Sequence, residues 1–159
     1  WGTAVSFSTV GGTGGGGTPG GGAGGSGSTG DVPAQVSAVI SGDTIEVLIA
    51  GARRQVKYLG VAAPAVSPAE CYASQAAAIN SQLVEGQMVR LSRDVSDTDA
   101  QGRLLRYVDV GDTFVNSALV QAGAARVRFE QPDVRFAQDF VALQTTAQQA
   151  RAGLWGACP

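Results

Sequence analysis

The sequence predicts an α+β chain that is mainly β: a five-stranded barrel with three helices, preceded by an N-terminal strand on a glycine-rich tether. Three observations support this fold class. Short runs after residue 31 alternate apolar and polar side chains, as strands do. Longer runs repeat apolar side chains every three or four residues, as helices do. Fourteen of the 23 glycines precede Asp31, in a stretch without a charged residue, so we expect the folded domain to span residues 31–159.

The predicted strands of the barrel begin with a meander. Ser41-Gly42 and Gly51 separate three alternating runs in the manner of hairpin turns. The predicted strands are 34–40, 44–50, 53–61, 88–91 and 104–110, with a brief strand at 125–129, and the inward side chains of the meander are Val36, Ile45, Val47, Val56 and Leu59. Five strands with interposed helices suit the small barrel of the oligonucleotide/oligosaccharide-binding (OB) fold.

Three stretches have helical spacing, and each ends at a glycine. Residues 70–84 precede Gly86, residues 116–122 precede Gly123, and residues 134–152 precede Gly153. Glycine commonly ends helices because it adopts the left-handed conformation at low cost. We therefore expect three helices, of which the last is the longest.

The first thirty residues divide into a predicted strand and a linker. Residues 3–10 alternate, and residues 11–30 consist almost entirely of Gly, Ser, Thr and Pro. An alternating strand on an uncharged tether fits strand addition to a neighbouring copy. Val5, Phe7 and Val10 are therefore predicted to form an assembly arm that promotes self-association. Docking of the same strand onto its own barrel is the alternative.

Charge and apolar content limit the partners and the location of the chain. The net charge of −2 gives no electrostatic excess for tight nonspecific binding of nucleic acid. No apolar run approaches the ~20 residues that a membrane-spanning helix needs. The first residue is Trp1 rather than Met, which leads us to expect a removed secretion signal and a secreted or cell-surface protein.

The two cysteines are expected to form a disulfide. Cys71 and Cys158 lie 87 residues apart, and closing a loop of this length is worth about 4–5 kcal/mol in the chain-entropy model. An exported protein would meet the oxidising conditions that this bond requires. Two unrelated buried thiols are the alternative.

Five short motifs occur in an order and spacing that resemble the staphylococcal nuclease family. The motifs are Ser-Gly-Asp-Thr at 41–44, Val-Lys-Tyr-Leu-Gly-Val at 56–61, Asp99 with Gly102-Arg103, Val115-Asn116 with Gly123-Ala124, and Ala150-Arg151 with Gly153-Leu154-Trp155. Each motif is weak alone, but five in register are specific. The resemblance covers the chain from about Val32 to Pro159 and implies a five-stranded barrel with three helices.

The resemblance implies a calcium-dependent phosphodiesterase site, in which carboxylates hold the ion and activate water while two arginines neutralise the phosphate. Asp43 matches the first metal carboxylate and Arg103 the second arginine. Three positions depart from the family pattern: Ala62 replaces the second metal carboxylate, Ala65 the glutamate base, and Lys57 the first arginine. We therefore expect a degenerate site with no bound metal, no cofactor and no enzymatic activity.

The two matching residues also have purely structural interpretations. Asp43 follows a glycine in a hairpin, where its carboxylate is placed to hydrogen-bond the turn backbone. Arg103 is placed to cap the barrel or to join a surface ion network with Asp97 and Asp99. The chain has no histidine, which excludes acid–base chemistry by that side chain.

These observations lead to one functional hypothesis and two alternatives. We expect a non-catalytic, secreted structural or assembly subunit, such as an extracellular filament or surface protein, with its N-terminal strand donated to a neighbour. The first alternative is a monomeric binding module that uses the barrel cleft for nucleic acid, sugar or protein. The second is a calcium-dependent secreted nuclease.

Overall fold

The computed structural model describes residues 31–159. The predicted assembly arm, which contains Val5, Phe7 and Val10, and the predicted linker at residues 11–30 lie outside the described residues. Both therefore stay predictions.

The main sheet closes into a barrel. Its strands are β2 (Val32–Ser41), β3 (Thr44–Ile49), β4 (Ala52–Tyr58), β6 (Met88–Ser92), β7 (Leu104–Val110) and the short β8 (Thr113–Phe114), in the order β4-β3-β2-β6-β7-β8. These neighbours pair antiparallel. β4 also pairs in parallel with β7, which joins the two sides of the sheet. Five of these strands, β2, β3, β4, β6 and β7, close the barrel, and β8 pairs only with β7. The predicted mainly β fold with a five-stranded barrel is therefore confirmed.

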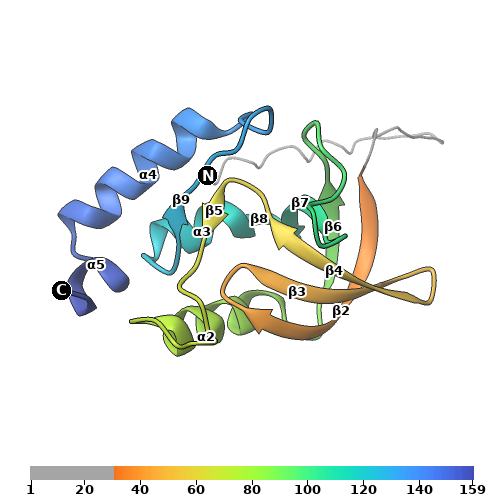
Figure 1. The fold of residues 1–159 in the computed structure, drawn as a ribbon, viewed down its shortest axis with the longest axis horizontal. Helices are drawn as coiled ribbons and strands as arrows, with labels where there is room; N and C mark the ends of the chain where they lie inside the picture. The colour runs from red at the N-terminus through yellow and green to blue at the C-terminus, as the bar shows by residue number, and fades with distance from the viewer. Residues whose placement is uncertain (1–30) are drawn as a thin grey trace.

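Helices cover one side of this barrel (Figure 1). The three predicted helices are α2 (Ala73–Val84), α3 (Val115–Gln121) and α4 (Ala137–Gln149), and a four-residue helix, α5 (Leu154–Ala157), follows them. α2 packs against β2, whereas α3 contacts β7, α2 and α4. Among the described residues, no helix is both long and apolar enough to cross a membrane.

The core lies between the barrel strands and the helices. All five side chains predicted to point inward from the meander are buried: Val36, Ile45, Val47, Val56 and Leu59. Leu91 and Val108 complete the strand layer, while Leu119 and Phe140 add the helix layer. The alternation in the sequence therefore identified the correct face of each strand in the meander.

The predicted strand at 53–61 is interrupted, and this interruption shapes the cleft described below. β4 ends at Tyr58, and a separate strand, β5 (Val61–Ala62), pairs antiparallel with β9 (Arg126–Val127) outside the barrel. Gly60 between them has a φ of 81°, in the left-handed region that favours glycine. A Cβ atom on Gly60 would also lie 2.5 Å from the ring of Phe140. The turn at Gly60 thus directs the chain away from the barrel.

The ends of two predicted helices differ from the structure. The helix predicted over 70–84 begins at Ala73, and the helix predicted over 134–152 covers only Ala137–Gln149. Phe136, just before α4, is partly buried against the core. An apolar residue in a flanking loop thus continues the helical spacing in the sequence without belonging to the helix.

The predicted disulfide between Cys71 and Cys158 is confirmed. The two Cα atoms lie 5.9 Å apart across a sequence separation of 87 residues. Cys71 lies two residues before the start of α2, and Cys158 follows α5. The bond therefore ties the C-terminal tail to the start of the first helix.

Candidate functional site

A cleft of about 360 Å³ opens beside the end of β4. Three segments that are distant in the sequence form it: the turn from β4 into β5, the loop before β7, and the segment after β9. Its lining residues are Lys57, Tyr58, Leu59, Gly60, Val61, Asp99, Ala100, Gln101, Arg103, Leu105, Arg128, Glu130 and Asp133. The predicted site residues Lys57 and Arg103 thus meet in one cleft.

Asp43 lies behind this cleft, in the hairpin between β2 and β3. The hairpin requires glycine at position 42, because a Cβ atom there would lie 2.7 Å from Cβ of Ala63 and 2.9 Å from Cβ of Ala76. Contacts this short do not occur between real side chains. The close packing of Gly42 brings the Asp43 carboxylate up to the chain after β5.

Four donors surround the Asp43 carboxylate. Oδ1 accepts hydrogen bonds from the hydroxyls of Ser41 and Thr44, each at 2.9 Å. Oδ2 accepts from Nζ of Lys57 at 2.7 Å and from the backbone N–H of Ala63 at 2.8 Å. A carboxylate offers about four lone-pair positions, so these donors use them all.

The donors also fix the charge of Asp43. Burial raises the pKa of this carboxyl, but attraction to Lys57 and hydrogen bonds from Lys57, Ala63 and Thr44 outweigh burial, so the pKa lies below its ordinary value. Asp43 is therefore ionised at neutral pH and balances the charge of Lys57.

Lys57 reaches Asp43 because of strand register. In the antiparallel β3–β4 pair, Lys57 lies opposite Thr44, the residue after Asp43. Its side chain is 22% exposed, and within residues 31–159 its Nζ makes a single hydrogen bond, to Asp43. An ammonium group has three donor positions, so two of them have no partner among residues 31–159.

Arg103 enters the same cleft from the loop before β7. Asp99 holds it: Oδ2 of Asp99 accepts from Nε of Arg103 at 2.7 Å, and Oδ1 accepts from the backbone N–H of Arg103 at 2.9 Å. The guanidinium forms no other hydrogen bond with the part of the chain that the structure describes. Its two terminal nitrogens are therefore available to a ligand.

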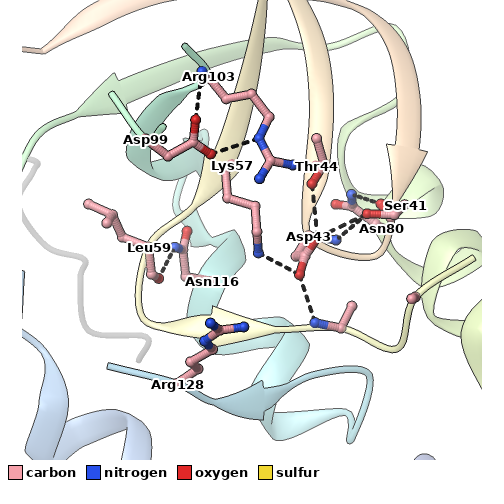
Figure 2. A network of polar contacts seen from close by, with 12 residues as sticks. Ser41, Asp43, Thr44, Lys57, Leu59, Asn80, Asp99, Arg103, Asn116 and Arg128 are labelled. Carbon is pink, nitrogen blue, oxygen red and sulfur yellow. Dashed lines mark hydrogen bonds and ion pairs between the residues drawn. The ribbon is translucent and has the colours of Figure 1, made fainter. Parts of the chain in front are cut away.

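Arg128 is a third cation at the cleft, and sequence reasoning missed it. Its NH2 group lies 3.2 Å from Oε2 of Glu130, and both side chains are well exposed. The backbone N–H of Arg128 donates to the carbonyl of Gly60, which attaches this segment to the turn after β4. Figure 2 shows Arg128 on the opposite side of Lys57 from Arg103, with Asp43 at the flank.

Two buried asparagines support the site from behind. Oδ1 of Asn80 on α2 accepts from the hydroxyl of Tyr58 at 2.8 Å, and its Nδ2 donates to the carbonyl of Ser41 at 2.9 Å. Nδ2 of Asn116 donates to the carbonyl of Leu59, and its Oδ1 accepts from the backbone N–H of Val108. Helices α2 and α3 thus fix the Asp43 hairpin and the turn after β4.

The predicted surface ion network is only partly formed. Arg103 pairs with Asp99 at 2.7 Å, but Asp97 pairs with Arg106 at 2.8 Å instead. Asp43 does not hydrogen-bond the backbone of its turn through its carboxylate, since its backbone donor is Ala63 from the chain after β5.

The side chains around Asp43 do not fit a calcium ion. Calcium takes six to eight oxygen ligands, but both oxygens of Asp43 already accept hydrogen bonds and a lysine ammonium lies 2.7 Å away. Ala62 and Ala65 carry methyl groups, which cannot ligate a metal. Within residues 31–159, no group of three or more His, Cys, Asp or Glu side chains could hold a metal ion.

Comparison with known proteins identifies relatives of the chain. The family model described as staphylococcal nuclease homologue matches residues 55–157. A thermonuclease of Staphylococcus hyicus is 30% identical over 125 residues, which cover 76% of this chain and 74% of that protein. A thermonuclease of Staphylococcus intermedius is 32% identical over 124 residues, with the same coverage. Endonuclease YncB of Bacillus subtilis (strain 168) is 32% identical over 130 residues, 78% of this chain and 62% of that protein.

These relatives confirm the resemblance and correct one expectation. The expectation that the chain is not an enzyme is contradicted, because the relatives carry the names thermonuclease and endonuclease. That expectation depended on the residues at a few positions, chiefly Ala62 and Ala65, and these do not determine what the remaining cleft can do. The hypothesis of a structural subunit gains no support from the relatives.

Proposed function

Because the chain belongs to the family of staphylococcal nuclease homologues, we propose that its cleft binds phosphodiester groups of nucleic acid and that the domain hydrolyses them. The observation that carries this proposal is the convergence of Lys57, Arg103 and Arg128 on one cleft. The three cations come from three separate segments, so the fold itself brings them together.

The spare donors of these cations suit a phosphate group. Arginine binds phosphate through two parallel N–H bonds, and lysine binds it as a compact charge. Arg103 has two terminal nitrogens without a partner in the described chain, and Lys57 has two unused donor positions. A phosphate oxygen placed between Arg103 and Lys57 would accept hydrogen bonds from the N–H donors that are not bonded to Asp99 or Asp43.

The same cations would favour hydrolysis of the bound group. Attack of water on a phosphodiester increases negative charge on the phosphoryl oxygens, and fixed cations stabilise that charge. Asp99 and Asp43 hold Arg103 and Lys57 in place before a substrate arrives. A cation that is already oriented loses little freedom when the charge develops.

Binding and cleavage of labelled single-stranded DNA and RNA test the proposal. Arg103→Ala should weaken binding by about 10- to 100-fold, since hydrogen bonds to charged groups contribute about 1.5–3 kcal/mol. With three cations in contact, the logarithm of the binding constant should fall against the logarithm of salt concentration with a slope of about −2. Products separated on a gel report cleavage.

Arg53→Ala is the matched control for this experiment. Arg53 is an arginine within β4, but its side chain is 76% exposed and does not line the cleft. The control should bind and cleave as the unmodified chain does. Absence of binding by the unmodified chain, or equal loss in both variants, would refute the proposal.

Self-association through residues 1–10 is a separate proposal. Its support is the alternation of Val5, Phe7 and Val10 in the sequence. The Cys71–Cys158 disulfide supports secretion or display at the cell surface, because such bonds persist in oxidising compartments. Removal of residues 1–10 should abolish any assembly seen by light scattering while the domain stays folded. Assembly by the truncated chain would contradict this proposal.

A further inference from the structure

We propose that the ammonium group of Lys57 takes the place of a divalent cation beside Asp43, so that the cleft binds a phosphate group without any metal. This inference rests on the proposed function, because it assigns a ligand chemistry to the same cleft. It starts from the donors that surround Asp43 in the folded chain.

The hydrogen bonds to the Asp43 carboxylate occupy the positions that a metal ion would need. Two hydroxyls, one ammonium and one backbone N–H all point at Asp43, at distances between 2.7 and 2.9 Å. A metal could bind Asp43 only after displacing some of these donors. The donors belong to the hairpin, to β4 and to the chain after β5, so the displacement would disturb three parts of the fold.

The charges of Asp43 and Lys57 also disfavour a divalent ion beside this carboxylate. Asp43 carries one negative charge, and Lys57 lies 2.7 Å from it. A divalent ion at the same carboxylate would lie next to an ammonium of like charge, with no second carboxylate to offset the repulsion, since positions 62 and 65 are alanines. One carboxylate paired with one ammonium is electrically balanced, so this pair has no need of a further cation.

Lys57, Arg103 and Arg128 line one cleft, and Asp43 does not. Figure 2 shows Lys57 extending from β4 with its ammonium at Asp43, and Arg128 reaching toward the same space from below. The lining also contains three carboxylates, and each has a partner: Asp99 pairs with Arg103, Glu130 with Arg128, and Asp133 accepts two backbone N–H bonds. A phosphate group would therefore meet the ammonium of Lys57 and the arginine donors that these pairs leave unused.

The test compares binding of a short fluorescent single-stranded DNA in excess chelator and in excess calcium. Equal affinity in the two buffers is the expected result. Binding that requires calcium would overturn this inference and leave the proposed function standing. Failure to bind in either buffer would refute the proposed function as well.

Thermal unfolding of the unmodified chain gives a second readout. A ligand that binds only the folded state raises the unfolding midpoint, so calcium should leave the midpoint of this chain unchanged. A saturable rise with calcium would overturn the inference, whether or not nucleic acid binds.

A variant tests the role of the ammonium directly. Lys57→Gln keeps a side chain that can donate to Asp43 but removes the charge, and it should weaken binding in chelator by about tenfold or more. Arg53→Gln is the matched control and should bind like the unmodified chain. Unchanged binding by Lys57→Gln would overturn the inference.

Discussion

Charged groups are satisfied to different degrees on two sides of the site: the hairpin side, where Asp43 lies behind the cleft, and the open side, where Arg103 and Arg128 line it. On the hairpin side, Asp43 is buried and accepts four hydrogen bonds, so little of its binding capacity is left. On the open side, the guanidinium of Arg103 is held through Nε alone, and Arg128 is well exposed. A saturated group stabilises the fold, whereas a group with spare donors can bind a ligand. Stability and binding are therefore expected to depend on different sides.

The largest effect on stability is expected from Asp43→Ala. This change leaves Lys57 without its partner in a largely buried setting, and breaking such a pair costs about 3–5 kcal/mol. The unfolding midpoint should fall by about 10 °C or more. Asp112→Ala is the control, because Asp112 is an exposed aspartate and should change stability by less than about 0.5 kcal/mol. Equal effects of the two changes would show that Asp43 is not a structural anchor.

Asp109 on β7 sharpens the comparison, because it is a half-buried carboxylate whose side chain accepts no hydrogen bond from the described residues, unlike that of Asp43. Burial raises its pKa to about 6; attraction to Arg90 opposes this shift, and Asp31 adds to it. At this residue the folded chain binds the proton more tightly than the unfolded chain, so the contribution of Asp109 to stability is greatest below about pH 4 and is lost as the pH rises to about 6.

Asp109→Asn should remove this loss of stability. At neutral pH the variant is expected to be more stable by up to about 3 kcal/mol, and below about pH 4 it should match the unmodified chain. Denaturant unfolding across this pH range measures the difference. A variant that is less stable at neutral pH would show that Asp109 has a favourable partner there.

A smaller effect on stability is expected from Asn80→Ala, on the helix α2 that supports the Asp43 hairpin. The change leaves the buried hydroxyl of Tyr58 and the carbonyl of Ser41 without a partner, which costs about 1–3 kcal/mol. Ser74→Ala, at an exposed position of the same helix, is the control. If the control destabilises the chain as much, the loss reflects the helix and not the support of the hairpin.

The smallest effect on stability is expected from Arg103→Ala, on the open side of the site. Its ion pair with Asp99 is partly exposed, and such pairs contribute about 1 kcal/mol or less. Chemical denaturation should detect little change, although binding of nucleic acid is expected to fall. A loss of stability as large as that of Asp43→Ala would contradict the expectation that stability and binding depend on different sides of the site.

The barrel could be predicted from the sequence because strands with one buried face impose strict alternation. Ile45, Val47 and Val56 are fully buried as predicted. The turn at Gly60 was missed because apolar residues continue past the end of β4: Leu59 and Val61 are both buried although β4 ends at Tyr58. Apolar residues record burial, and burial persists across a turn that stays on the core.

Half of the cleft could be predicted, and the other half could not. Lys57 and Arg103 lie in motifs that could be recognised one by one. Arg128 lies within the brief strand predicted at 125–129, of which the structure forms β9 (Arg126–Val127). Its position at the cleft depends on the pairing of β9 with β5, which the sequence pattern does not indicate. The buried position of Asn80 could have been predicted from the sequence, because it lies on the same face of α2 as the buried residues Ala76 and Val84. A polar residue on an apolar helix face predicts a buried hydrogen bond.

The parallel pairing of β4 with β7 has a consequence for any added strand. Closure joins β4 to β7, so these two strands are not left as fully open edges that another strand could extend. Within residues 31–159, the edges that stay open include the start of β4 before Val56, the outer side of β8, and the two-stranded β5–β9 sheet. A strand donated at β5–β9 would lie beside the cleft that Lys57 and Arg128 line, whereas one added at β8 would lengthen the main sheet.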